Sequence, residues 1–180
     1  MCIRDRTRPY DVCAPVIARA LRDAELEGIL DLASGGGGPW PGLREAIGRE
    51  GVDAAVTLSD MHPNRPAAER LDAVPGITYR RAPVSALQVS DGGRRMRTLF
   101  TGLHHFGPEA VRAILRDAQA ARVPFLAAEA TQRSVRGVLV SLFIPLLVLV
   151  LMPRVRPRKL VPLLLTYVLP VLPILILSLI

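Results

Sequence analysis

Four consecutive glycines, Gly35 to Gly38, follow a short apolar stretch and constrain this chain more than any other feature. Residues 28–33 predict a buried strand, and residues 54–59 predict a second strand that ends in front of Asp60. Glycines after a strand let the backbone approach a ligand closely, and a carboxylate at the tip of the next strand can accept hydrogen bonds from ribose hydroxyls. The pattern therefore predicts an α/β domain that holds a nucleoside-bearing cofactor.

Two well-known glycine loops do not fit these residues. A dinucleotide fingerprint G-x-G-x-x-G needs glycine at Trp40 if it starts at Gly35, and at Pro41 if it starts at Gly36. A phosphate-binding P-loop needs a lysine that closes the turn, and the first lysine of the chain is Lys159. Hydrolysis of a nucleoside triphosphate is thereby disfavoured. A nucleotide-dependent oxidoreductase of Rossmann type stays open as an alternative.

Hydrophobic periodicity predicts helices and strands that alternate along the chain. Such alternation implies parallel strands with crossover helices on both faces of one sheet. We expect Asp11 to cap a leading helix. The expected strands are 28–33, 54–59, 77–81, 98–103 and 123–128, and the expected later helices are 43–50, 65–73 and 108–121.

Residues 31–37 resemble the first motif of the class I S-adenosylmethionine-dependent methyltransferases, acid-x-Gly-x-Gly-x-Gly, with Asp60 as the second acid of that family. Residues 97–109 resemble the family's fourth strand, active-site loop and following helix start, so that the resemblance covers residues 28–131. It implies a Rossmann-like, doubly wound and mostly parallel sheet, a methyltransferase activity, and S-adenosyl-L-methionine as cofactor. The cofactor-binding residues that it implies are Asp31, Ala33, Ser34, Gly35, Gly36, Gly37, Asp60 and Met61.

The chain departs from the family pattern in two places. Ala33 stands where the family usually has its first glycine, and this methyl group would narrow the cofactor pocket. After the third expected strand, Ser85 or Gln88 occupies the neighbourhood of the usual adenine-side acid. A non-catalytic, membrane-tethered binding module with a methyltransferase-like fold is therefore a second alternative.

Two adjacent histidines, His104 and His105, follow the fourth expected strand and are the candidate catalytic residues. The carboxyl ends of parallel strands are where open α/β sheets bind ligands. Either imidazole could act as a general base if the methyl acceptor carries a proton that must leave. His62 is the only other histidine, and Cys2 and Cys13 lie far upstream, so we expect no metal site.

The composition changes abruptly after residue 136. Residues 137–152 and 160–180 carry no charge, and a basic segment, 153–159, separates them. At about 1.5 Å per residue the second run can span about 30 Å of hydrocarbon, whereas the first covers only about 24 Å. We expect a hydrophobic helical hairpin at 137–180, an α/β domain at 11–136, and a leader at 1–10 whose first six residues do not belong to the fold.

Charge suggests how this hairpin meets a bilayer. The preferred arrangement enters the cytoplasmic leaflet without crossing it, with the basic loop at anionic headgroups and the α/β domain in the cytoplasm. Two true spans with an exported basic loop stay open as an alternative. A pocket near the bilayer would suit a lipid or another lipophilic methyl acceptor, although an anchored enzyme with a soluble substrate would have the same sequence features.

The remaining composition narrows the class of protein. The net charge is +7, and the basic loop supplies +4 of it, leaving 19 basic against 16 acidic residues elsewhere. With aromatics at only 4%, the chain lacks the footprint of a nucleic-acid-binding protein. Two cysteines suit a reducing compartment. Because the sequence stops within an apolar run, we expect a fragment that lacks the last strands of the fold.

Overall fold

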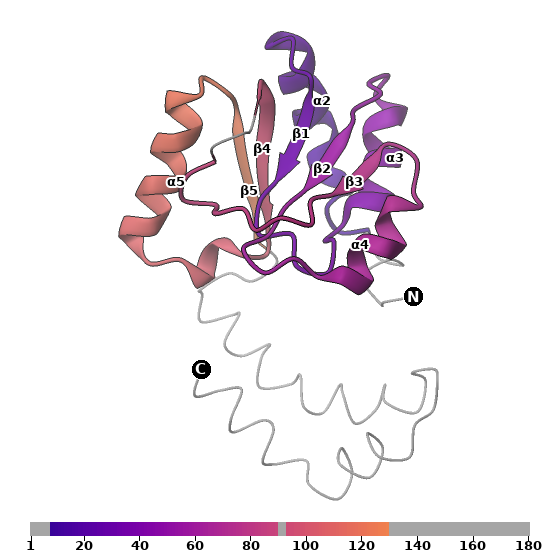
Figure 1. Cartoon of the computed structure of the whole chain (residues 1–180). Helices are drawn as coiled ribbons and strands as arrows, with labels where there is room; N and C mark the ends of the chain where they lie inside the picture. The colour runs from indigo at the N-terminus through magenta and orange to yellow at the C-terminus, as the bar shows by residue number, and fades with distance from the viewer. Residues whose placement is uncertain (1–7, 90–92, 130–180) are drawn as a thin grey trace, which may run out of the picture. The chain divides into compact units, whose positions relative to one another are not determined.

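The computed structural model describes residues 8–89 and 93–129. In these ranges strands and helices alternate as the sequence predicts (Figure 1). The elements are the 3-10 turn η1 (Asp11–Cys13), α2 (Ala14–Asp23), β1 (Gly28–Asp31), α3 (Trp40–Arg49), β2 (Val56–Leu58), α4 (Arg65–Asp72), β3 (Ile77–Tyr79), β4 (Arg95–Phe100), the 3-10 turn η2 (Leu103–His105), α5 (Pro108–Ala120) and β5 (Phe125–Ala128).

Within the described residues, five strands form one sheet in the order β3-β2-β1-β4-β5. All neighbouring strands pair in parallel, and Leu30 of β1 lies between Thr57 of β2 and Arg97 of β4. The chain winds outward in one direction from β1 through β3 and in the other from β4 to β5. This order confirms the predicted doubly wound parallel sheet and places its topological switch point at β1 and β4.

Helices cover both faces of this sheet, with α2, α3 and α4 on one face and α5 on the other (Figure 1). Successive residues of β1 point to opposite faces, so Ile29 packs in the core under α2, α3 and α4, while Leu30 packs in the core under α5. Because β1 is buried on both faces, its sequence is an uninterrupted apolar run up to Asp31.

An aromatic cluster fixes the carboxyl end of β4 against the helices. The ring of Phe100 meets Tyr10 edge-on at 5.1 Å and Trp40 edge-on at 5.5 Å between centroids. Trp40 is fully buried in the first turn of α3. This cluster therefore holds the amino-terminal segment, the start of α3 and β4 together at the carboxyl edge of the sheet.

Several boundaries differ from those predicted. The fourth strand runs from Arg95 to Phe100 rather than over 98–103, because Thr101 adopts a left-handed φ of 52° and η2 follows. Helix α3 begins at Trp40, three residues earlier than predicted. Pro41 in its first turn is compatible with this start, because the N–H that proline lacks has no hydrogen-bond partner within the helix at that position. Asp11 does not cap α2: it lies in η1, and Cys13 is the N-cap residue.

Residues 1–7 of the predicted leader, the hydrophobic runs 137–152 and 160–180, and the basic loop 153–159 lie outside the described residues. Within residues 8–89 and 93–129, no helix combines the length and apolar character needed to cross a membrane.

Candidate functional site

The glycine turn, residues 35–38, follows β1 at the carboxyl edge of the sheet. Gly35, Gly37 and Gly38 have φ values of 49°, 102° and 55°, which non-glycine residues rarely adopt. A methyl group added at Gly35 or Gly36 would meet nothing within 4 Å, whereas one added at Gly37 would lie 2.1 Å from the Leu71 side chain. Gly37 thus allows α4 to pack closely, and Gly35 and Gly36 expose their backbone to open space.

Asp60 follows β2 and holds this turn directly. Its Oδ2 accepts a hydrogen bond from the Gly35 N–H at 2.8 Å, and its Oδ1 accepts one from the His62 N–H at 2.8 Å. The structure therefore brings together the two features that the sequence singles out. Each carboxylate oxygen can accept a second hydrogen bond, which is what two ribose hydroxyls would require.

Asp31 and Ser34 lie beneath the turn and face the protein rather than the open space. The buried Asp31 carboxylate accepts hydrogen bonds from Ser34 Oγ at 2.6 Å and from Thr98 Oγ1 at 2.7 Å. Burial raises the pKa of Asp31 to about 6, although both hydrogen bonds favour the charged form. These two predicted site residues would therefore influence a ligand by shaping the turn.

Ala33 adopts a left-handed φ of 52°. An L-residue with a Cβ is strained there by about 1–2 kcal/mol, and glycine is not. The departure from the family pattern thus falls at a position where the backbone itself favours glycine.

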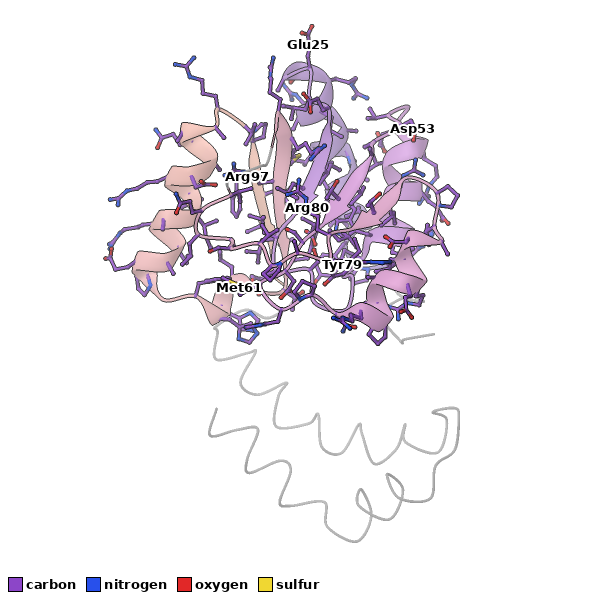
Figure 2. All side chains as sticks on the ribbon, viewed as in Figure 1. Glu25, Asp53, Met61, Tyr79, Arg80 and Arg97 are labelled. Carbon is purple, nitrogen blue, oxygen red and sulfur yellow. The ribbon has the colours of Figure 1, made fainter. Side chains whose placement is uncertain are left out.

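Two residues that sequence reasoning missed also hold the turn. The hydroxyl of Tyr79, the last residue of β3, donates to the Gly35 carbonyl at 2.8 Å. Arg70 of α4 donates through Nη2 to the Gly36 carbonyl at 2.9 Å. Neither residue belongs to a recognisable motif, so only the packing of β3 and α4 reveals them. Figure 2 shows Tyr79 and Met61 toward the same edge of the sheet.

The segment after β3 lies against the end of β2. The Val84 N–H donates to the Asp60 carbonyl at 2.9 Å, which brings the neighbouring Ser85 to this part of the sheet edge. Ser85 Oγ accepts from the Leu87 N–H at 3.3 Å, and Gln88 is exposed. Met61 is 48% exposed, so its apolar side chain is available to cover a flat ring bound beside Asp60.

At the ends of β4 and β5, His104 pairs with a carboxylate that the sequence analysis did not identify. His104 Nδ1 lies 2.8 Å from Glu129 Oε2, and Glu129 Oε1 accepts from the Leu103 N–H at 2.7 Å. Burial raises the pKa of Glu129. Hydrogen bonds from His104 and from the Leu103 N–H, together with the charge of His104, outweigh the effect of burial and hold that pKa below its ordinary value. With Nδ1 held, Nε2 is the nitrogen that can exchange a proton with a substrate.

His105 lies next to this pair, with its ring centroid 4.0 Å from that of His104, and both imidazoles are exposed. In the part of the chain that the structure describes, no group of three His, Cys, Asp or Glu side chains could hold a metal ion.

A cavity of about 370 Å³ lies beside Gly38, the last residue of the glycine turn. Its lining includes Tyr10, Leu71, Phe100 and Thr101, and from the turn it includes only Gly38. Neither Asp60 nor the candidate histidines line it, so this cavity is distinct from the open space in front of Gly35.

No protein-family model and no curated protein matches this chain. Solved structures do resemble it. The mitomycin 7-O-methyltransferase MmcR is 17% identical over 75% of this chain, with a TM-score of 0.50, and TnmH is 21% identical over 76%, also with a TM-score of 0.50. The chain spans 41% and 42% of the length of these two proteins. The chain therefore has the Rossmann-like fold found in methyltransferases such as MmcR.

Proposed function

We propose that this chain is an S-adenosyl-L-methionine-dependent methyltransferase. The observation that carries the proposal is the hydrogen bond between the Asp60 carboxylate and the Gly35 N–H, beside a glycine backbone that faces open space. This arrangement lies at the carboxyl ends of β1 and β2, where doubly wound sheets bind nucleosides. The likeness in fold to MmcR, whose name describes it as a methyltransferase, supports the same reading.

The residues at this edge fit such a cofactor. The Asp60 oxygens would accept from the ribose hydroxyls, and the backbone of Gly35 and Gly36 would allow the cofactor to approach because no Cβ fills that space. Met61 would cover the adenine ring with its exposed side chain. When bound, the cofactor supplies an electrophilic methyl group on a positively charged sulfur.

His104 would take the proton that leaves the methyl acceptor. General-base catalysis needs an imidazole of fixed orientation, and Glu129 supplies that by holding Nδ1. The Leu103 N–H in turn holds the other oxygen of Glu129. We assign proton transfer to His104 and the positioning of its ring to Glu129. His105 has the same chemistry without the bond to Glu129.

The acceptor would be a lipid or another lipophilic molecule, and the protein would associate with a membrane on its cytoplasmic side. The support for this part of the proposal is the composition of residues 137–152 and 160–180, which carry no charge and flank a basic loop. A domain held at a bilayer would receive such an acceptor directly from the lipid phase.

Methyl transfer tests the acceptor and the base together. The full chain in detergent is supplied with S-adenosylmethionine labelled on its methyl group and with a membrane lipid extract. We expect label in the organic phase and a rate lowered about 10²- to 10⁴-fold in His104→Gln, while S-adenosylhomocysteine binding is unchanged. The matched His105→Gln variant keeps its rate. Label only in water-soluble products would contradict the lipophilic acceptor, and an active His104→Gln would contradict the base.

Cofactor titration separates this proposal from its two rivals. We expect S-adenosylhomocysteine to bind the full chain saturably and NAD⁺ not to bind, because the dinucleotide fingerprint fails at Trp40 and Pro41. Binding of NAD⁺ alone would favour an oxidoreductase. Binding of S-adenosylhomocysteine without transfer to any acceptor would favour a non-catalytic module.

A further inference from the structure

Tyr79 is held at both its backbone and its hydroxyl. Its backbone N–H donates to Asp72 Oδ1 at 2.8 Å, at the end of α4, and its hydroxyl donates to the Gly35 carbonyl at 2.8 Å. Asp72 is itself fixed by Arg81, whose Nη2 lies 2.8 Å from Asp72 Oδ2. The Tyr79 side chain therefore links β3 to the glycine turn in a fixed orientation.

Hydrogen bonds consequently hold both the N–H and the carbonyl of Gly35. Asp60 accepts from its N–H, and Tyr79 donates to its carbonyl. Gly35 has a left-handed φ of 49° and no side chain, so its own covalent structure scarcely restricts the backbone there. The two hydrogen bonds are what fix the orientation of this peptide relative to the carboxylate.

Burial makes the Tyr79 contact selective for one conformation of the turn. Tyr79 is only 2% exposed, so a turn that moved away would deprive a buried phenol O–H of the carbonyl that accepts its hydrogen bond. Burial also raises the pKa of Tyr79, so the hydroxyl, which is protonated at neutral pH even at its ordinary pKa, remains a donor. Arg70, which is exposed, adds a further restraint by donating to the Gly36 carbonyl at 2.9 Å.

We propose that Tyr79 is a positioning residue for cofactor binding, which holds the glycine turn in its binding conformation through the Gly35 carbonyl. This inference rests on the proposed function, because it names a residue that preorganises the same site. A turn that is already ordered binds more tightly, since the cofactor does not have to order it. Tyr79 touches the turn and not the open space in front of it, so it acts through Gly35.

The test compares Tyr79→Phe with Tyr10→Phe in the full chain in detergent. Both substitutions remove one phenol hydroxyl that forms a hydrogen bond, but the partner of Tyr10 is Thr101 Oγ1 rather than the turn. We expect S-adenosylhomocysteine affinity to fall about tenfold in Tyr79→Phe and to stay unchanged in Tyr10→Phe. Amide hydrogen exchange at residues 35–37 should accelerate only in Tyr79→Phe, with or without ligand.

These two measurements keep the outcomes apart. If the wild-type chain does not bind S-adenosylhomocysteine, the proposed function fails, and the exchange data still decide whether Tyr79 fixes the turn. If the wild type binds and Tyr79→Phe binds equally well, the positioning role is wrong. Equal exchange at residues 35–37 in both variants would also overturn it. Unfolding followed by Trp40 fluorescence verifies that each variant is folded.

Discussion

We expect Asp117→Asn to lower the free energy of unfolding of the α/β domain by about 3–5 kcal/mol, because it leaves the buried positive charge of Arg97 without its carboxylate partner. Arg97 lies within β4 with its side chain only 3% exposed, and its guanidinium pairs with the Asp117 carboxylate of α5. Burial lowers the pKa of Arg97. Among the described residues its Nε has no hydrogen-bond partner, so Asp117 carries most of the compensation for that charge.

Chemical denaturation followed by Trp40 fluorescence measures this effect. Trp40 is the single tryptophan of the chain and is fully buried, so its emission reports on the α/β domain. Asp23→Asn is the matched control, since it breaks the exposed Arg19–Asp23 pair and should cost less than about 1 kcal/mol. A loss in Asp117→Asn no larger than in this control would show that Arg97 is solvated. The double variant Arg97→Met with Asp117→Leu should recover most of the stability.

The second large effect is a dependence of stability on pH, which arises from Asp31. Burial raises the pKa of this carboxyl from 3.8 to about 6 in the folded chain. Between these values the folded state keeps a proton that the unfolded chain has lost. The stabilising contribution is therefore complete below the unfolded pKa and is lost as pH rises through about 6. A shift of about two pKa units corresponds to about 3 kcal/mol.

Asp31→Asn isolates this contribution. Asparagine keeps the shape of the side chain but does not titrate, so the fall in stability between about pH 4 and pH 7 should be smaller by about 3 kcal/mol than in the wild type. Asp53→Asn is the control, because the Asp53 side chain is 90% exposed. Parallel pH profiles for the wild type and Asp31→Asn would contradict the assignment. Trp40 fluorescence follows the unfolding transition in all three proteins.

The fold could be predicted from the sequence because its signals are local. Apolar runs, a glycine turn and amphipathic helices recur in an order that few architectures share, and the parallel sheet confirms that prediction. The boundaries were harder to place. The early end of β4 depends on the left-handed Thr101, and the early start of α3 depends on the burial of Trp40 against Phe100, which is a tertiary contact.

The candidate site was predictable only in part. The contact between Asp60 and Gly35 was predictable, because both residues follow neighbouring strands and both belong to the methyltransferase-like pattern in the sequence. The contacts of Tyr79 with Gly35, of Arg70 with Gly36 and of Glu129 with His104 join residues 44, 34 and 25 positions apart. Such contacts depend on which strands and helices become neighbours, and no spacing in the sequence encodes them. Asp31 is the opposite case: the motif identifies it as a cofactor-binding residue, but its buried carboxylate bonds to Ser34 and Thr98 of the protein itself.

The central claim is that the edge of the sheet at Asp60 binds S-adenosylmethionine. Calorimetric titration of S-adenosylhomocysteine into the full chain in detergent tests it directly, with Asp60→Ala beside Asp53→Ala. Both aspartates flank β2, but Asp53 precedes it and Figure 2 shows this residue toward the edge opposite Met61 and Tyr79. We predict saturable binding to the wild type and to Asp53→Ala, and no measurable binding to Asp60→Ala. Equal binding by both variants, or none by a folded wild type, would contradict the claim.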